Sequence, residues 1–194
     1  MAEPLAVCLH AALRAGPLLG KTVLVTGCGP IGVLCILAAR RAGADRIVAT
    51  DLGPFTLTIA KQAGADVTHD MALNADALAD YARDKGSFDV LFECSGAAQA
   101  VLAAIPAMRP GGTILQLGLG GDMTLPVQVI TAKELSLKGS FRFHEEFGLG
   151  VRLMQNGLID VKPLITQTFP LTEAVAAFET AGDRSLAMKA QIAF

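Results

Sequence analysis

The stretch Thr22-Val-Leu-Val-Thr-Gly27-Cys-Gly-Pro-Ile-Gly32 decides the fold of this 194-residue chain. It begins with a short β-branched run, which predicts a buried strand, and its glycines open the amphipathic stretch Ile31–Ala42, which predicts a helix. In such a unit Gly27 permits a tight turn, Gly29 lets the backbone approach a diphosphate, and Gly32 lets helix and strand pack closely. N–H groups at the start of the helix attract anions. The residues expected to hold the diphosphate are Gly27, Cys28, Gly29, Pro30, Ile31 and Gly32.

An acid ends the next apolar run, Arg46-Ile-Val-Ala-Thr-Asp51. A carboxylate at this place can accept hydrogen bonds from the ribose hydroxyls of a dinucleotide. It repels a 2′-phosphate, and residues Leu52–Leu57 supply no cation, so the sequence favours NAD over NADP. The alternative is that Asp51 only caps the end of its strand. An adenosylmethionine-dependent methyltransferase can use a similar glycine loop and acid, and stays open as a function.

Strand-like and helix-like runs alternate along the chain, which is typical of repeated βαβ units with a parallel sheet. The expected strands are Thr22–Thr26, Arg46–Asp51, Asp66–His69, Phe88–Cys94, Gly112–Gly118 and Leu135–Ser140. The expected helices are Ile31–Ala42, Pro54–Ala63, Asn74–Lys85, Gln99–Met108 and Glu145–Asn156. Together they predict an α/β fold, a doubly wound parallel sheet of the Rossmann class.

Two segments fall outside this scheme and suggest a second structural unit. The first is an apolar helix at Pro4–Ala15, which precedes the first strand instead of following one. The second is a tail with an expected strand at Ile165–Phe169, a helix at Thr172–Ala181 capped by Thr172, and a strand at Met188–Phe194.

Composition narrows the function classes. The chain is 52% hydrophobic and only 18% charged, a balance that suits strands buried on both faces. Its net charge of −2, without a basic cluster interleaved with aromatics, indicates no nucleic-acid partner. No apolar run is long enough to span a membrane, and no secretory signal begins the chain. The 4 cysteines lack metal-type or disulfide-type spacing, so we expect a reduced protein of the cytoplasm.

Three motifs imitate other kinds of site. Gly16–Thr22 resembles a phosphate-binding loop, but it is one residue short and precedes a strand. Tyr81 and Lys85 have the spacing of a short-chain dehydrogenase pair on one helix face, yet that helix is expected far from the nicotinamide end. Cys8 and His10 lie two apart on a helix, so they point in different directions and cannot share a metal ion. The histidines expected to have only structural or solvent contacts are His10, His69 and His144.

Arg142 follows the sixth expected strand, at the carboxyl edge where open α/β sheets bind ligands. Its guanidinium can hold a carboxylate or vicinal hydroxyls through two parallel hydrogen bonds. The equally weighted alternative is a surface arginine paired with Glu145 or Glu146.

Several motifs form a recognisable set: Glu3-Pro-Leu-Ala-Val, Val25–Gly32, Phe88-Asp-Val-Leu-Phe-Glu93-Cys-Ser-Gly96, Leu117-Gly-Leu-Gly-Gly121, Lys133–Phe143 and Ala181–Phe194. Through them the chain resembles the zinc-dependent medium-chain dehydrogenases, in particular the polyol branch that includes sorbitol dehydrogenase. The resemblance covers the whole chain but only the later part of the family's usual length.

The resemblance implies further site residues. Residues along the adenosine side of NAD would be Cys94, Ser95 and Gly96, and those approaching the nicotinamide would be Leu117, Gly118, Leu119, Phe141 and Arg142. Arg142 would also touch a polyhydroxy substrate as the one catalytic-site contact. Glu3 matches a family position near the catalytic metal. One carboxylate cannot hold zinc, so zinc is expected only in an intact protein that carries the family's N-terminal GroES-like catalytic domain.

The resemblance also implies a domain organisation and an activity. Residues 1–18 would be a linking helix from the catalytic domain, 19–160 the NAD-binding Rossmann domain, and 161–194 a C-terminal segment of the catalytic domain. The implied reaction oxidises a secondary alcohol of a polyol or sugar acid, with L-idonate to 5-ketogluconate foremost, and transfers hydride to NAD or, less readily, NADP. The chain alone is expected to bind cofactor without turnover and to form a homo-oligomer through the edge of the sixth strand. A non-catalytic NAD-binding module is the remaining alternative.

Overall fold

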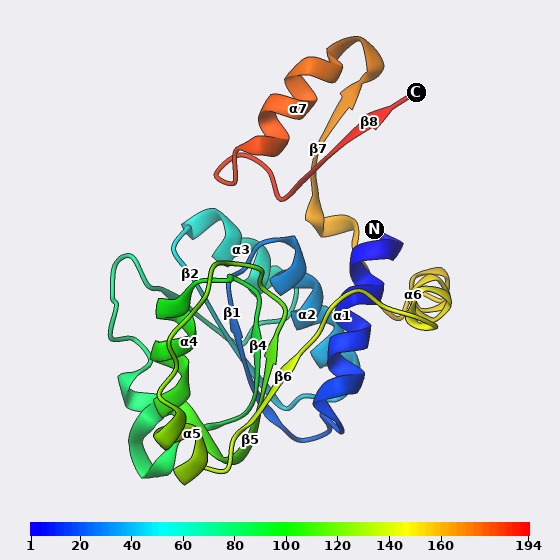
Figure 1. Ribbon diagram of the computed structural model, residues 1–194. Helices are drawn as coiled ribbons and strands as arrows, with labels where there is room; N and C mark the ends of the chain where they lie inside the picture. Colours follow the sequence, from blue (N-terminus) through cyan, green and yellow to red (C-terminus); the bar gives the residue numbers. More distant parts are fainter.

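The computed structural model describes residues 1–194, and its main body is a six-stranded parallel sheet covered by helices on both faces (Figure 1). The strands are β1 (Thr22–Thr26), β2 (Arg46–Asp51), β3 (Val67–Asp70), β4 (Phe88–Glu93), β5 (Met108–Gln116) and β6 (Ser136–Gly139). Their order across the sheet is β3-β2-β1-β4-β5-β6. This is the order of the doubly wound dinucleotide-binding fold, and it reverses between β1 and β4. The predicted fold class is confirmed.

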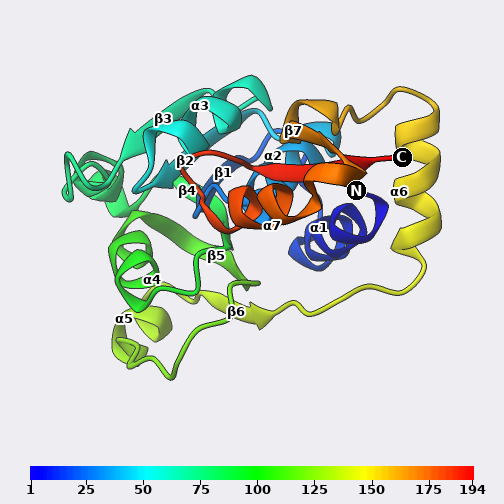
Figure 2. The ribbon, with the colours of Figure 1, turned by 90° about the horizontal axis from the view of Figure 1, so that it is seen from above.

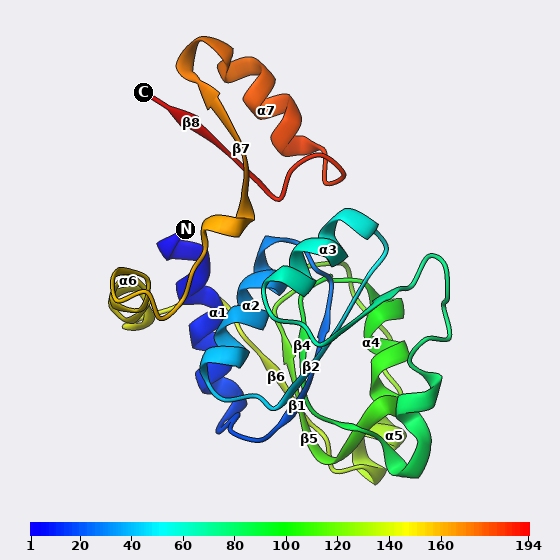
Figure 3. The same ribbon diagram turned by 180° about the vertical axis from the view of Figure 1, so that it is seen from behind.

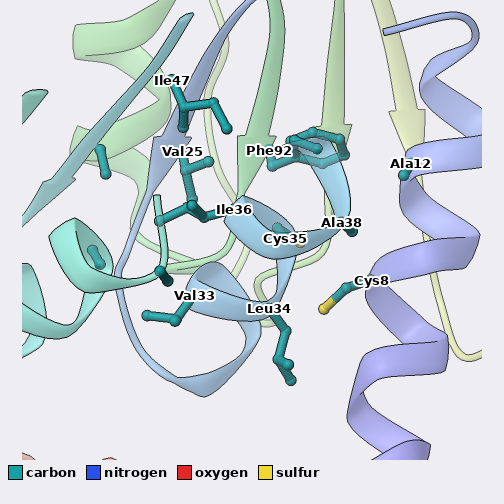
Figure 4. Close-up of a cluster of buried hydrophobic side chains, with 14 of the residues drawn as sticks. Cys8, Ala12, Val25, Val33, Leu34, Cys35, Ile36, Ala38, Ile47 and Phe92 are labelled. Carbon is teal, nitrogen blue, oxygen red and sulfur yellow. The ribbon is translucent and has the colours of Figure 1, made fainter. Parts of the chain in front are cut away.

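Alternate residues of the central strands supply two hydrophobic cores, one on each face of the sheet. In β1, Val23 and Val25 belong to the larger cluster and Leu24 to the smaller one. The larger cluster includes side chains of α1 (Ala2–Ala15), α2 (Pro30–Arg41) and α3 (Pro54–Gln62). Figure 4 shows Cys8 and Ala12 of α1 projecting towards α2, whose Ile36 lies beside Val25 of β1. The smaller cluster is covered by α4 (Ala98–Ala104) and α5 (Val127–Ala132).

The C-terminal part leaves this body. Helix α6 (Glu146–Gln155) lies against α1 at one side of the molecule (Figure 2). Beyond it β7 (Ile165–Pro170), α7 (Ala174–Gly182) and β8 (Lys189–Ala193) form a separate unit, a parallel strand pair covered by one helix (Figures 1 and 3). The predicted strand–helix–strand tail is therefore confirmed, although Thr172 does not cap α7 because no side-chain cap is present there.

The helix expected at Asn74–Lys85 is wrong. The segment forms turns followed by a 3-10 stretch at Ala79–Lys85, which is broken by Arg83 and by Asp84 with a φ of 52°. Short polar side chains bind the local backbone instead: Asn74 Oδ1 accepts a hydrogen bond from the Asp76 N–H at 3.2 Å. Such turns compete with helix formation.

Other differences concern element boundaries. Helix α4 ends early because a 3-10 turn containing Pro106 follows it, and β5 begins at Met108 instead of Gly112. Helix α5 was not predicted, and Cys94 lies after β4 rather than in it. None of the helices combines the length and hydropathy needed to cross a bilayer.

Candidate functional site

The loops that follow β1, β2, β4, β5 and β6 emerge at one edge of the sheet, because all its strands are parallel. These loops carry most of the residues predicted from the sequence. The site is thus assembled from segments that are far apart in the chain.

The glycine loop after β1 is tightly packed at Gly27 and Gly32 but has free space at Gly29. Gly27 has a φ of 84°, and a Cβ there would lie 2.8 Å from the Cα of Ser95; one on Gly32 would lie 1.8 Å from the carbonyl oxygen of Gly27. Gly29, the N-cap of α2, has a φ of −65° and nothing within 4 Å of a Cβ position. A phosphate needs such free space beside the first N–H groups of a helix, so the loop fits the diphosphate of a dinucleotide.

Asp51 joins the loops after β1 and β2. Its Oδ2 accepts a hydrogen bond from the Cys28 N–H at 2.5 Å, and its Oδ1 accepts from the N–H groups of Leu52 and Gly53 at 2.7 and 3.0 Å. The capping contacts considered as the alternative are therefore present. Because each carboxylate oxygen can accept more than one hydrogen bond, the ribose contact of Asp51 stays a prediction.

The loops after β4 and β5 meet at the carboxylate of Glu93, for which no role was predicted from the sequence. Glu93 is 0% exposed at the end of β4. Its Oε1 accepts from the Ser95 N–H at 2.9 Å and its Oε2 from the Gln116 side-chain amide at 2.6 Å. A charged residue ending an apolar strand was the only signal in the sequence.

A cavity of about 460 Å³ opens beside the ends of β5 and β6. Its lining residues are His10, Arg14, Gln116, Gly118, Leu119, Gly139, Ser140 and Phe141. Of the predicted nicotinamide-side residues it contains Gly118, Leu119 and Phe141. The hydroxyl of Ser140 is buried without a hydrogen-bond partner. Buried polar groups are nearly always paired, so this hydroxyl is an exception within the described structure.

Arg142 does not form the surface ion pair considered as its alternative role. It is exposed, has a φ of 58°, and its guanidinium lies 5.2 Å from the centre of the Phe141 ring. Glu146 instead accepts a hydrogen bond from His10 at 2.9 Å. Partial burial would raise the pKa of Glu146, but hydrogen bonds from His10 and from backbone N–H groups outweigh this and lower its pKa to about 2.

The cysteines, scattered in sequence, partly gather in space. The Sγ atoms of Cys94 and Cys35 lie 3.9 Å apart, and the thiol of Cys8 donates to the Ile31 carbonyl at 3.3 Å. Burial raises the pKa of Cys8 and Cys28. The main cause of the raised pKa is a hydrogen bond with Cys8 at Cys35, and one with Cys35 at Cys94. Thiols of raised pKa are poor nucleophiles, so this cluster does not indicate covalent catalysis.

The residues present do not fit a zinc site. Glu3 is exposed in the first turn of α1, and no group of three or more histidine, cysteine or acidic side chains is placed to hold a metal ion. Cys8 and His10 have different hydrogen-bond partners, the Ile31 carbonyl and Glu146.

The two other motifs that resemble known sites, Tyr81 with Lys85 and Gly16–Thr22, do not have the geometry of those sites. Tyr81 binds His69 at 3.0 Å and stacks on Phe88, and it lies in the irregular 3-10 stretch, so the expected helix face shared with Lys85 does not exist. Gly16–Thr22 leads into β1 and does not follow a strand.

The chain is similar to known proteins in both sequence and structure. A model of the family described as zinc-binding dehydrogenase matches residues 30–156. L-idonate 5-dehydrogenase (NAD(P)(+)) of Escherichia coli K12 is 41% identical over 194 residues, which are 100% of this chain and 56% of that protein. Sorbitol dehydrogenase of Homo sapiens is 38% identical over 184 residues, which are 92% of this chain and 51% of that protein.

The fold of the chain is also similar to that of solved dehydrogenase structures. The crystal structure of the Escherichia coli L-idonate 5-dehydrogenase aligns with a TM-score of 0.93, covering 100% of this chain and 56% of that one. A putative zinc-binding dehydrogenase from Sinorhizobium meliloti 1021 bound to NADP, 28% identical, aligns with a TM-score of 0.86, covering 98% of this chain and 57% of that one. The chain spans about half the length of these relatives. Because the family model matches more than half of its residues, the chain belongs to the zinc-binding dehydrogenase family.

Proposed function

We propose that this chain binds a nicotinamide dinucleotide across the carboxyl edge of its sheet, as the cofactor-binding part of an oxidoreductase that oxidises a secondary alcohol. The observation that carries the proposal is the glycine loop, in which Gly27 and Gly32 are closely packed while Gly29 faces open space at the start of α2. The loop lies at the reversal point of the strand order, which is where open α/β sheets bind nucleotides.

The proposed placement follows the edge of the sheet. The diphosphate lies over Gly29, the adenosine ribose beside Asp51, and the nicotinamide enters the cavity lined by Leu119 and Phe141. Phe141 and Leu119 supply apolar surface beside the ring. When bound, the nicotinamide supplies the hydride acceptor. The residues of this chain would bind and orient it against the substrate carbon.

NAD is the proposed cofactor, in preference to NADP. The support is the Asp51 carboxylate, which no lysine or arginine pairs within 4.0 Å and which repels a 2′-phosphate. The Escherichia coli relative is named for both cofactors, and the Sinorhizobium meliloti relative is bound to NADP.

The proposed substrate is a polyol or sugar acid, with L-idonate foremost. Support comes from the two relatives named for L-idonate and sorbitol. Arg142 is exposed and free of ion pairs, so its guanidinium is available to a carboxylate or to vicinal hydroxyls. A catalytic zinc would need ligands from outside these residues, and no step proposed for this chain depends on it.

The terminal segments are proposed to belong with a further domain, residues 1–18 as its linking helix and 161–194 as its C-terminal part. The helix α7 supports this, because Val175 and Phe178 are 74% and 76% exposed. The edge of β6, where Leu137 is 45% exposed, is the proposed contact between subunits of a homo-oligomer. The cytoplasm is the proposed location, in keeping with four free cysteines.

Calorimetric titrations with NADH, NADPH and adenosylmethionine test the proposal. We expect NADH to bind most tightly and adenosylmethionine not to bind. Preference for adenosylmethionine would support the methyltransferase alternative and contradict the proposal. Addition of L-idonate or sorbitol with NAD to the chain alone should give no reduced cofactor, whereas turnover would show that the chain needs no further domain.

A further inference from the structure

We infer that Glu93 is a positioning residue of the cofactor site: its buried carboxylate ties the loop after β4 to the last residues of β1 and β5, and so fixes the groove across which the dinucleotide lies. Its effect on cofactor binding rests on the proposed function. Its effect on the loops does not, and can be measured without any cofactor.

The sheet itself places Glu93 at the centre of this edge. Thr26 of β1, Glu93 of β4 and Gln116 of β5 are paired neighbours in one row across the sheet. Each is the last residue of its strand, and the order of strands reverses between β1 and β4. A fully buried carboxylate in this row is costly unless hydrogen bonds replace the water it has lost.

The surroundings of Glu93 consist only of donors. Its Oε1 accepts from the N–H groups of Ser95 and Gly96 at 2.9 and 3.1 Å and from the hydroxyls of Ser95 and Thr26. Its Oε2 accepts from the Gly96 N–H at 3.1 Å and from Gln116 Nε2 at 2.6 Å. No lysine, arginine or histidine pairs with it.

This donor set matches a side chain that accepts at both of its oxygens. Backbone N–H groups can only donate, and the amide of Gln116 is oriented by a second acceptor, the Gly118 carbonyl at 2.9 Å from the same nitrogen. An amide at position 93, as in Glu93→Gln, would place an NH2 group, which cannot accept, against some of these donors. Charge-assisted bonds from several donors hold the two loops more firmly than neutral ones.

The loops after β4 and β5 also contact each other directly, so we expect them to move together. A Cβ on Gly118 would lie 2.1 Å from the Gly96 nitrogen and 2.6 Å from Glu93 Oε2. The N–H groups of Leu117 and Gly118 both donate to the Glu93 carbonyl at 2.9 Å. Residues predicted on the adenosine side and on the nicotinamide side are thus both anchored at Glu93.

Strand β4 also contains a matched control. Asp89, at the opposite end of β4, accepts a hydrogen bond from the Thr22 N–H at 2.8 Å and pairs with Lys21 and Arg109 at 3.6 and 3.1 Å. Like Glu93, Asp89 is a carboxylate that accepts a hydrogen bond from β1, in this case from a backbone N–H instead of a hydroxyl. It lies at the end of β4 opposite to the proposed cofactor site. Asp89→Asn therefore makes the same chemical change in the same strand.

The test compares Glu93→Gln with Asp89→Asn and the unchanged chain. Hydrogen–deuterium exchange without cofactor should be at least tenfold faster at the N–H groups of Ser95, Gly96 and Gly118 in Glu93→Gln only. The Kd for NADH should rise at least tenfold in Glu93→Gln and less than twofold in Asp89→Asn. Gly118→Ala, which disturbs the same contact sterically, should not add its full effect to that of Glu93→Gln in a double variant.

Each outcome is decisive. Unchanged exchange in Glu93→Gln, or additive effects in the double variant, would overturn the inference, as would an equal loss of NADH affinity in Asp89→Asn. If Glu93→Gln does not fold, Gln116→Met removes only one donor to Glu93 and must still accelerate exchange at Gly118, and unchanged exchange there overturns the inference. If the unchanged chain fails to bind NADH while Glu93→Gln still loosens both loops, the proposed function fails and the anchoring role stands.

Discussion

Gly29→Ala separates the stability of the glycine loop from its ability to bind cofactor. Gly29 has an ordinary φ of −65°, and a methyl group there meets nothing within 4 Å. Alanine at a helix N-cap is less favourable than glycine, by about 0.5–1 kcal/mol, but it also lowers the entropy of the unfolded chain by an offsetting amount. The free energy of unfolding should therefore change by less than about 1 kcal/mol.

The same methyl group occupies the space proposed for the diphosphate. It would push the phosphate away from the N–H groups that begin α2 by about a bond length, ~1.5 Å. Loss of one hydrogen bond to a charged group costs about 1.5–3 kcal/mol. The Kd for NADH should accordingly rise about 10- to 100-fold.

Chemical denaturation and calorimetric titration with NADH measure the two effects. Gly182→Ala in α7 is the control, because it also meets nothing within 4 Å but lies in the C-terminal unit, so it should leave the Kd for NADH unchanged. Gly32→Ala gives the contrast, since its Cβ would lie 1.8 Å from the Gly27 carbonyl oxygen and must destabilise the fold. Undiminished NADH affinity in Gly29→Ala would refute the placement of the diphosphate.

Three further predictions concern charge and acidity. Asp51→Ser removes the charge that repels a 2′-phosphate, so the affinity ratio of NADPH to NADH should rise at least tenfold in paired titrations; an unchanged ratio would remove Asp51 from cofactor choice. The pKa of Glu146 is lowered from 4.5 to about 2, so its ionised form stabilises the folded chain by an amount on the order of 1 kcal/mol. This contribution is complete above about pH 5 and is lost as the pH falls from about 5 to about 2. Urea denaturation should thus show Glu146→Gln to be less stable than the unchanged chain at pH 7 but not at pH 2; a constant difference would contradict this. Since the pKa of Cys28 is raised, a thiol reagent at pH 8 should react much faster with the unfolded chain than with the native one, and equal rates would contradict its burial.

The central strands β1, β2 and β4 could be predicted because their burial on both faces leaves a local signal. Runs such as Thr22–Thr26 and Arg46–Asp51 have apolar, mostly β-branched centres, and glycine follows each of them closely. The glycine loop could be predicted for the same reason, since its function requires small residues at fixed spacing after a strand.

The contacts of Glu93 could not be predicted, because they depend on the register of three strands. Nothing local to Phe88–Glu93 indicates that Thr26 and Gln116 become its neighbours. The proximity of Cys35 and Cys94 has the same origin, since they are brought together by packing of α2 on β4. The false helix at Asn74–Lys85 had acceptable helical spacing, but side-chain acceptors there bind the local backbone.

The most direct test of the central claim is a hydrogen–deuterium exchange footprint of the folded chain with saturating NADH. We predict slower exchange at the N–H groups of Cys28–Gly32 and Leu117–Leu119, with no change in α7. No protection, or protection confined to segments away from the carboxyl edge of the sheet, would contradict the account.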